Sequence, residues 1–452
     1  MVSGSENLER GLGLKEATAV NMIDMVGIGP FIVIPFVIQY LPGRQSLVAW
    51  LAGAVLALFD GCVWAELGAA MPQAGGSYVF LREEYGPKRW GRLMSFLLIW
   101  QTLIQAPLVM ASGAIGFAQY LTYIHPMGSL QQKAVAGATV VVVILLLYRG
   151  IATIGKISML MWVGVVGTMA WLIWGGLTHF NLQLFDGPAG TGGDSWLSIV
   201  FLAALGHATV QTVYTYLGYY NVANVGGEVR EPEKNIPRTI FISIFFIALL
   251  YLAMQTSILG VVPWSVARES PFIVSTFVQM TYGASWASLA TGLILFIAFC
   301  SLFSATLGYS RIPYAAALDG NFFSVFGKVH PKKRFPHVSL LVLGLVALIF
   351  SLLFKLRFVI SAILAMRCLI QFIGQSIGLL LLRRRWPAEK FPFRMWMYPL
   401  PVLIALIGWA AIFVSTGVKL MLAALVFAAA GVAVYAVRAR VLKQWPFEEA
   451  EA

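Results

Sequence analysis

Long apolar segments separated by short polar stretches dominate the chain. A membrane-spanning helix needs about 20 mostly apolar residues, and a window of that length finds twelve such segments. They lie at 17–41, 46–71, 91–122, 132–148, 151–177, 196–225, 237–262, 285–318, 337–354, 358–382, 398–416 and 418–437. The pattern predicts an all-α polytopic membrane protein with twelve transmembrane helices.

Composition supports this interpretation. The 452 residues are 59% hydrophobic and 11% charged, with a mean hydropathy of +0.82, whereas an average soluble domain is about 25% charged. A globular core could not bury so much apolar surface, which excludes a soluble enzyme, a disordered chain and a fibrous repeat. The polar residues 1–16 precede an apolar segment too long for a signal-peptide core, so we expect no cleavable leader.

Basic residues indicate the orientation. The net charge is +12, from 31 Lys and Arg against 19 Asp and Glu. With a cytoplasmic N-terminus, the inner stretches hold 23 of the basic residues and the outer ones six. This asymmetry predicts a multi-pass protein with both termini cytoplasmic. The short loops and the lack of long termini suggest a prokaryotic inner (cytoplasmic) membrane. No basic stretch lies apart from the apolar segments, so we expect no nucleic-acid partner.

A few ionisable residues lie inside the apolar segments, where a charge costs several kcal/mol. They are Asp24, Asp60, Glu66, Lys156 and Arg367. For Glu66, near the end of its segment, a structural pairing is favoured. For Asp60 the structural and functional interpretations both stay open. Lys156 lies deep in the fifth segment and Arg367 near the membrane midplane, which makes both candidates for function.

Two of the segments look broken. The first contains Gly27-Ile28-Gly29-Pro30, and the sixth contains the polar, aromatic stretch 214–221. Proline removes a backbone donor and glycine relaxes the helix. Breaks in the first and sixth segments predict a five-plus-five inverted repeat. The predicted parts are 1–16 (N-terminal segment), 17–177 and 196–382 (repeats), 398–437 (two extra C-terminal helices) and 438–452 (tail).

Broken helices of this kind line a central site in secondary transporters. The N-terminus of a half-helix binds an anionic group, and free carbonyl oxygens bind a cation. A zwitterionic amino acid would satisfy both, although the spacing alone does not name the substrate.

Four local motifs extend this interpretation. They are G-I-G-P-F at 27–31, A-E-L-G-A-A-M-P-Q-A-G-G-S-Y at 65–78, E-V-R-E-P-E-K-N-I-P-R at 228–238, and S-R at 310–311 with D-G at 319–320. In this order they resemble the amino acid–polyamine–organocation (APC) superfamily, in its neutral amino-acid permease branch, with a LeuT-like fold. The resemblance covers nearly the whole chain.

The resemblance implies a substrate site on both breaks. Its carboxylate-binding N–H groups match Gly27, Ile28 and Gly29. Its amine-binding segment matches Tyr214, Tyr216, Leu217 and Gly218, with Tyr214 as the gate that closes the site from outside. Gln105, Arg367 and Ser301 are possible pocket residues.

The resemblance also suggests how transport is coupled. Lys156 looks like the fifth-helix lysine that several bacterial members place beside the first break, where its ammonium takes the space of a sodium ion. This predicts sodium independence, and because a desolvated lysine can exchange a proton, proton symport and exchange both remain open. Asp24 is acidic where other amino-acid members are not. It could partner Lys156 or Arg367 or attract a cationic substrate, which leaves a polyamine or organic amine importer as the alternative.

Other classes fit poorly. The chain has no H-E-x-x-H, G-x-S-x-G or phosphate-loop motif and no row of like-charged pore residues, so we expect neither an enzyme nor a channel. We expect no cofactor and no metal. Residues 122–132 lack the cysteine that links eukaryotic members to a heavy chain, so no disulfide-linked partner is expected. The expected partners are a small-molecule substrate (an amino acid or an amine) and the lipid bilayer.

Overall fold

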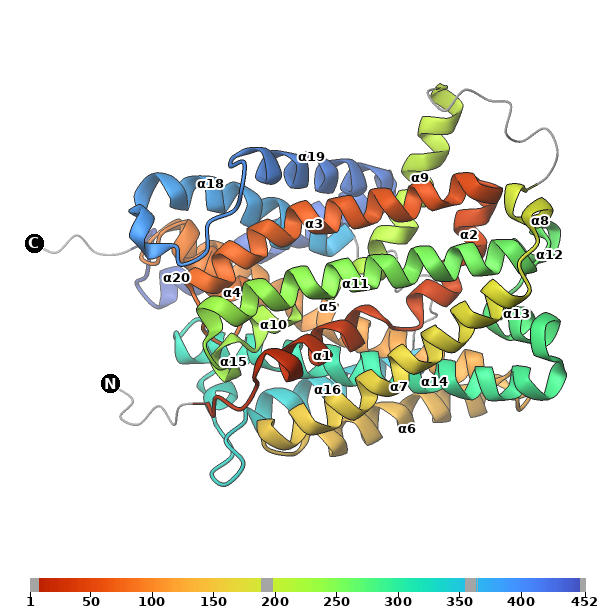
Figure 1. Ribbon diagram of the computed structural model, residues 1–452. Coiled ribbons are helices and arrows are strands. Elements are labelled where there is room, and N and C mark those ends of the chain that lie inside the picture. Colours follow the sequence, from red (N-terminus) through yellow and green to blue (C-terminus); the bar gives the residue numbers. More distant parts are fainter. Residues whose placement is uncertain (1–7, 188–197, 354–362, 364, 448–452) are drawn as a thin grey trace, which may run out of the picture.

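The computed structural model describes residues 8–187, 198–353, 363 and 365–447. Long helices lie side by side and run between two opposite ends of the molecule (Figure 1). Within the described residues there is no β-strand, only two isolated bridges. The protein is therefore an all-α polytopic membrane protein, as the hydropathy pattern predicts.

Eight helical stretches of the described chain are long and apolar enough to cross a membrane, and a ninth counts if α1 (Leu14–Met25) and α2 (Gly29–Tyr40) form one bent span. The eight are built on α3 (Ser46–Ala70), α5 (Trp90–Leu121), α6 (Ser129–Leu147), α7 (Ile151–Thr178), α11 (Pro232–Val261), α14 (Ala284–Tyr309) continued by α15 (Arg311–Leu318), η4 (Cys368–Gly374) continued by α18 (Gln375–Arg385), and α20 (Val418–Val441). The other apolar helices are α9 (Ile199–Tyr216), α16 (His337–Leu353) and α19 (Leu400–Ser415). Each of the twelve predicted segments contains one of these helices, while the count of twelve spans stays a prediction.

Both predicted breaks are present. The axes of α1 and α2 differ by 46°, and α9 is followed by an extended turn before the short α10 (Asn221–Asn224). Gly218 lies in that turn with φ +119°, a conformation that favours glycine. A Cβ atom on Gly218 would lie 3.0 Å from the Met25 nitrogen and 3.1 Å from the Asp24 carbonyl carbon. The two breaks thus touch each other because this residue has no side chain.

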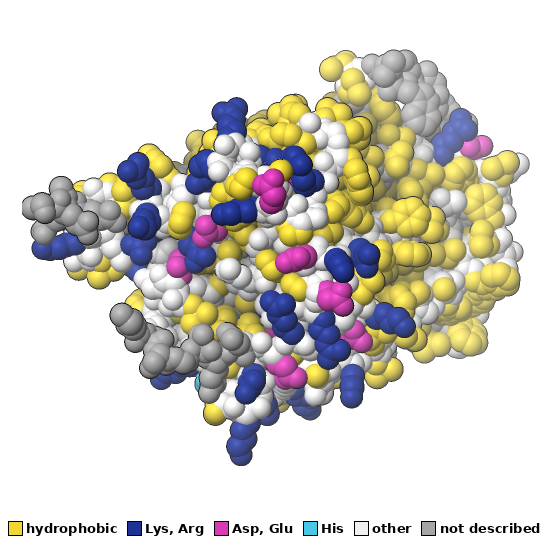
Figure 2. All heavy atoms as spheres, turned by 60° about the vertical axis from the view of Figure 1, so that its left-hand side comes forward, with side chains coloured by type: hydrophobic (Ala, Val, Ile, Leu, Met, Phe, Trp, Pro, Cys, Tyr) yellow, Lys and Arg dark blue, Asp and Glu magenta, His cyan; other side chains and the backbone are white. Residues whose placement is uncertain are grey.

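The two ends of the molecule differ in charge. Figure 2 brings forward the end at which both termini lie, and Lys and Arg side chains gather there among acidic ones. Hydrophobic side chains cover the surface farther from this end. We call it the basic end.

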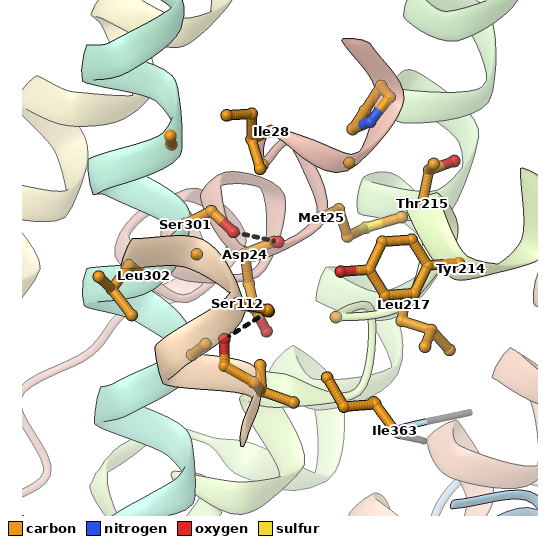
Figure 3. A pocket seen from close by; sticks show the side chains of 18 of the residues that line it. Asp24, Met25, Ile28, Ser112, Tyr214, Thr215, Leu217, Ser301, Leu302 and Ile363 are labelled. Carbon is orange, nitrogen blue, oxygen red and sulfur yellow. Dashed lines mark hydrogen bonds between the residues drawn. The ribbon is translucent and has the colours of Figure 1, made fainter. Parts of the chain in front are cut away.

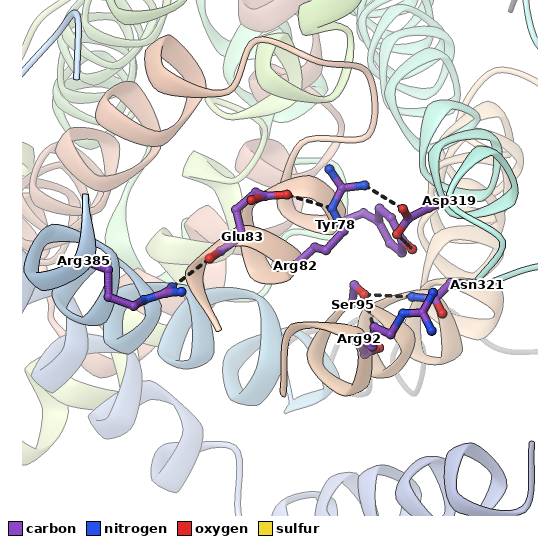
Figure 4. Close-up of polar contacts among 8 residues, drawn as sticks. All are labelled: Tyr78, Arg82, Glu83, Arg92, Ser95, Asp319, Asn321 and Arg385. Carbon is purple, nitrogen blue, oxygen red and sulfur yellow. Dashed lines mark hydrogen bonds and ion pairs between the residues drawn. The ribbon is translucent and has the colours of Figure 1, made fainter. Parts of the chain in front are cut away.

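Polar contacts join the elements at the basic end (Figure 4). On α4 (Ser77–Glu84), Arg82 pairs with Asp319 at 2.9 Å, and the Tyr78 hydroxyl donates to the same carboxylate. Glu66 at the end of α3 accepts from Arg383 at 2.5 Å, so the structural pairing favoured for Glu66 is confirmed. These contacts fix α4 and α18 against the long helices.

Two further contacts close the basic end above the centre of the bundle. Arg311 forms a buried ion pair with Glu228, at the end of the short turn η2 (Gly226–Glu228), at 2.7 Å. Leu12, which is buried, forms a β-bridge with Val229. In this bridge the N–H of Leu12 donates to the Glu228 carbonyl, and the Leu12 carbonyl accepts from the N–H of Arg230. The chain preceding α1 is thereby held against the segment that follows the second break.

Candidate functional site

A cavity of about 90 Å³ lies where the two helix breaks meet. The first break, the turn after α9, and one face each of α5 and α14 form its walls (Figure 3). Arg367, just before η4, completes the lining. The cavity therefore collects residues from five separate segments of the chain.

Glycine at the first break allows close approach of its neighbours. A Cβ atom on Gly29 would lie 3.2 Å from the ring of Tyr214, and one on Gly27 would lie 2.6 Å from the Ser301 hydroxyl. The Ser301 hydroxyl donates to the carbonyl oxygen of Asp24 at 3.0 Å. Larger residues at either glycine would fill the cavity or push its walls apart.

The start of α2 offers backbone donors to the cavity. The first N–H groups of a helix have no acceptor within it, and the helix dipole favours an anion there. The N–H of Gly27 donates to the Met25 carbonyl at 3.0 Å. This leaves the N–H groups of Ile28 and Gly29 as the ones that can take an anionic group.

Among the described residues, one base and one acid line this cavity. Arg367 is only 3% exposed. Its guanidinium donates to the Tyr220 hydroxyl. It also donates from Nη2 to the side-chain oxygen of Gln105 at 2.9 Å when the Gln105 amide is oriented with its oxygen toward Arg367. It also lies over the rings of Tyr220 and Tyr309, at 5.5 and 5.3 Å from their centroids. Aromatic faces and neutral acceptors thus hold the guanidinium in place, and it forms no ion pair with any described residue.

Asp24 presents its carboxylate to the same cavity. It is the last but one residue of α1 and is half-buried. Among the described residues it forms no ion pair and no side-chain hydrogen bond, and Arg367 is the charged group whose field reaches it. The two charges compensate each other across the cavity while both remain free to contact a ligand.

Most of the predicted site residues come together here. The cavity is lined by Asp24, Gly27, Ile28, Gly29, Tyr214, Leu217, Gly218, Ser301 and Arg367. Figure 3 shows the Tyr214 hydroxyl directed into the cavity from the side opposite Ser301. Its role as a gate stays a prediction.

Three predicted residues do not line the cavity. Tyr216 is buried behind it, where its hydroxyl donates to the Trp50 carbonyl at 3.1 Å. Gln105 lies behind Arg367 and positions it. Lys156 has an exposed side chain on α7.

The position of Lys156 has a simple geometric cause. Its neighbour Gly155 faces Glu16 and Leu12 at the start of α1, and successive helical residues point about 100° apart. Because α7 begins at Ile151, Lys156 is only five residues, or about 7.5 Å, from the helix end. A lysine can extend its ammonium over that distance to the interface, so the structure does not bring Lys156 to the first break.

Several lining residues were not among the predicted ones. They are chiefly Ser112, Val109, Tyr220, Tyr309 and Ile363. Two of these places are recognisable in the sequence as unusual for a lipid-facing helix: the run of small residues Ala111-Ser112-Gly113 and the aromatic stretch around Tyr220. The apolar residues do not, because an apolar side chain in a spanning helix can face lipid, core or cavity alike.

Comparisons with known proteins identify the family to which the chain belongs. The family model described as "Amino acid permease" matches residues 12–436. The serine/threonine exchanger SteT of Bacillus subtilis is 25% identical over 90% of this chain and 91% of its own length. The glutamate/serine transporter AimA of the same organism is 25% identical over 86% of this chain and 74% of its own. The branched-chain amino acid permease BcaP of Lactococcus lactis is 25% identical over 91% and 92%.

The match of the family model spans nearly all of the helices described above, including both breaks. The relatives are named for transport of amino acids and none for an enzymatic reaction, which confirms the predicted class. The chain belongs to the amino acid permease family, within the APC superfamily.

Proposed function

We propose that this protein is a secondary active transporter that carries amino acids across the cytoplasmic membrane by alternating access. The observation that carries the proposal is the cavity between the two helix breaks. Backbone N–H groups at Ile28 and Gly29 suit the carboxylate of a zwitterion, and Asp24 with the carbonyl oxygens near Gly218 suits its amine. Both ends of an amino acid find a partner there.

The arrangement of the two ends of the molecule supports alternating access. At the basic end, the Arg311–Glu228 pair and the Leu12–Val229 contact close the bundle. Towards the opposite end, a second cavity reaches Ile32, which also lines the first one. We assign the basic end to the cytoplasm. In this conformation the substrate cavity is therefore closed toward the cytoplasm, and the second cavity leads from it toward the outside. The segments 17–177 and 196–382, each with a break in its first helix, would be the two repeats.

We further propose transport without sodium, coupled to protons or operating as exchange. The Arg367 guanidinium already supplies a positive charge opposite Asp24, which removes the need for a sodium ion to balance it. The coupling role predicted for Lys156 stays a prediction that its exposed position does not support.

Asp24 keeps an amine importer as the second candidate. A carboxylate in the cavity would attract an organic amine or polyamine. The guanidinium of Arg367 in the same cavity repels such a cation, and the relatives are named for serine, threonine, glutamate and branched-chain amino acids. An amino acid is therefore the better-supported substrate.

An uptake screen tests the proposal. The purified protein in liposomes would be given labelled L-serine, L-leucine, L-glutamate and putrescine, with and without sodium, at two pH values. We expect uptake of at least one amino acid, unaffected by sodium. Gly29→Leu is the matched control, because its side chain would enter the cavity and abolish uptake. Uptake of putrescine alone would favour the amine importer, and no uptake of any compound would refute transport of these classes.

A further inference from the structure

A second acid lies in the membrane interior, outside the substrate cavity. Asp60 is in the middle of α3, and only 1% of it is exposed. The hydroxyl of Tyr219 donates to its Oδ2 at 2.5 Å, and the indole groups of Trp64 and Trp409 lie beside it. No basic side chain of the described residues forms an ion pair with it.

A short aromatic segment connects Asp60 with the cavity. Tyr219 follows Gly218, whose backbone lies against Asp24, and it precedes Tyr220, which accepts a hydrogen bond from Arg367. The Tyr220 ring also stacks on Trp64, one turn beyond Asp60, with centroids 4.6 Å apart. Asp60 is thus connected to the substrate site through the contacts of Tyr219 and Tyr220.

Few other titratable groups surround Asp60. Those whose charge interacts with it are Cys62 on α3, Tyr219 and Tyr220 after α9, and Cys368 in η4. The nearby helix α19 contributes the neutral indole of Trp409. At neutral pH none of these supplies a positive charge to compensate an ionised Asp60.

The buried acidic and basic groups do not balance in the centre of the described bundle. At the basic end, Glu66 pairs with Arg383 and Glu228 pairs with Arg311, so both pairs are neutral. In the centre of the described bundle remain two carboxyl groups, Asp24 and Asp60, against the single guanidinium of Arg367. Burying one uncompensated negative charge costs several kcal/mol. One bound proton makes the centre neutral.

The geometry decides which carboxyl group carries that proton. Asp24 lines the cavity, is only half-buried, and lies within the field of the positively charged Arg367. Asp60 is sealed from the cavity and has only neutral partners. The proton therefore belongs on Asp60.

We propose that Asp60 is a proton-binding site of this transporter, separate from the substrate cavity and linked to it through Tyr219 and Tyr220. The inference rests on the proposed function and assigns the coupling ion to a residue. The proton binds the carboxylate in the conformation open to one side and leaves to the other side after the conformational change. Ionisation of Asp60 would strengthen its hydrogen bond with the Tyr219 hydroxyl and so shift the neighbouring Gly218. Substrate affinity and proton affinity then change together.

Transport measurements on Asp60→Asn test the coupling. Asparagine keeps the shape of the side chain and cannot bind a proton in this range. In liposomes, with L-serine, L-leucine and L-glutamate as probes, exchange of the transported amino acid should stay within about twofold of wild type, while substrate-driven proton movement should fall at least about tenfold. Wild-type proton movement in Asp60→Asn, or no proton movement in the wild-type protein, would overturn the inference and leave amino-acid exchange standing.

A second readout does not depend on transport. The infrared spectrum of the full-length protein in lipid at neutral pH should contain the C=O stretch of a protonated carboxyl group. Asp60→Asn should remove the Asp60 component of that band and leave any component from the buried Glu84. Glu233→Gln, which changes an exposed acid of α11, should leave the whole band unchanged. A band unchanged in Asp60→Asn refutes the proton site. A component lost in Asp60→Asn, from a protein that transports no amino acid, supports the site and refutes the proposed function.

Tyr219→Phe provides the graded variant. It removes the hydrogen bond from the Tyr219 hydroxyl to the carboxyl group and leaves the ring packing of Tyr219 intact. We expect the pH of half-maximal uptake to rise, because the ionised carboxylate loses its donor. An unchanged pH profile would contradict the link between Asp60 and the second break.

Discussion

Arg367 and Lys156 look alike in the sequence, since both are bases inside apolar segments. The structure separates them by environment. Arg367 is 3% exposed and held by Tyr220 and Gln105, whereas Lys156 has an exposed side chain. Removing each charge should therefore have very different consequences.

We expect Arg367→Gln to lower amino-acid uptake in liposomes by at least about tenfold. Removing the guanidinium leaves Asp24 without the positive charge that compensates it, and an uncompensated charge inside the membrane costs several kcal/mol. Lys156→Gln is the matched control and should keep uptake within about twofold of wild type, as expected for an exposed position. Loss of uptake or of its pH dependence in Lys156→Gln would restore the coupling role that the family resemblance implies.

Much of this residue-scale picture was predictable. Gly27, Gly29 and Gly218 are recognisable because a helix break needs glycine or proline, and this requirement is local. Whether Lys156 or Tyr216 faces the cavity depends on where its helix begins and which neighbours pack on it. Asp24, Ser301 and Arg367 line the same cavity as these glycines. Tyr216 and Lys156 do not, because the rotation of α9 and of α7 turns these side chains away from it.

Among the elements, α4 illustrates how an amphipathic helix is fixed at the basic end. Glu84 is fully buried there, and neither carboxylate oxygen has a hydrogen-bond partner within the described chain. Burial raises the pKa of Glu84 well above its usual value, and the charge of Arg385 offsets only part of this effect. The folded protein therefore holds this proton more tightly than the unfolded chain.

This linkage predicts how stability depends on pH. Because the folded-state pKa of Glu84 is raised, its proton uptake favours the folded state below that pKa, and this stabilisation is lost as the pH rises through it. Glu84→Gln should thus raise the thermal midpoint at pH 8 and change it little at pH 5. Thermal unfolding in detergent at both pH values measures this, and an equal shift at both would contradict a titrating Glu84.

The ion pair between Arg311 and Glu228 connects α15 to the segment after the second break. Both side chains are at most 1% exposed. We expect Arg311→Met to destabilise the protein by about 3–5 kcal/mol, because it leaves a buried carboxylate unpaired. The double variant with Glu228→Leu should regain most of that loss, since a buried pair replaced by apolar residues is often neutral. Denaturant or thermal unfolding measures the stability of both variants. Recovery of stability in the double variant indicates an isolated ion pair, and no recovery indicates that further residues depend on it.

At the scale of the whole molecule, the two ends are built differently. The basic end is closed by ion pairs and by the contact of Leu12 with Val229. The opposite end has a cavity between α2, α5 and the loop before α13 (Ile273–Tyr282), and it reaches Ile32 at the edge of the substrate cavity. Hydropathy and the distribution of basic residues predict which end of the molecule is cytoplasmic. Only the contacts around the two helix breaks show which end is closed.

This asymmetry makes a labelling prediction. The native cysteines, Cys62, Cys300 and Cys368, are all buried, so new surface cysteines can be followed over a low background. In intact cells, a membrane-impermeant thiol reagent should label Gln39→Cys at the opposite end and should not label Lys332→Cys at the basic end. Both positions are exposed, so permeabilised cells should show labelling of both.

Ile32→Cys extends the same experiment to the path into the cavity. Because Ile32 lines both cavities, the reagent should reach it from outside more slowly than it reaches Gln39→Cys, and a transported amino acid should slow it further by favouring closure. Labelling of Lys332→Cys in intact cells would reverse the orientation proposed from the basic residues. Labelling of Ile32→Cys only from the basic end would show that the resting protein opens inward, against the closed contacts of Arg311 and Leu12.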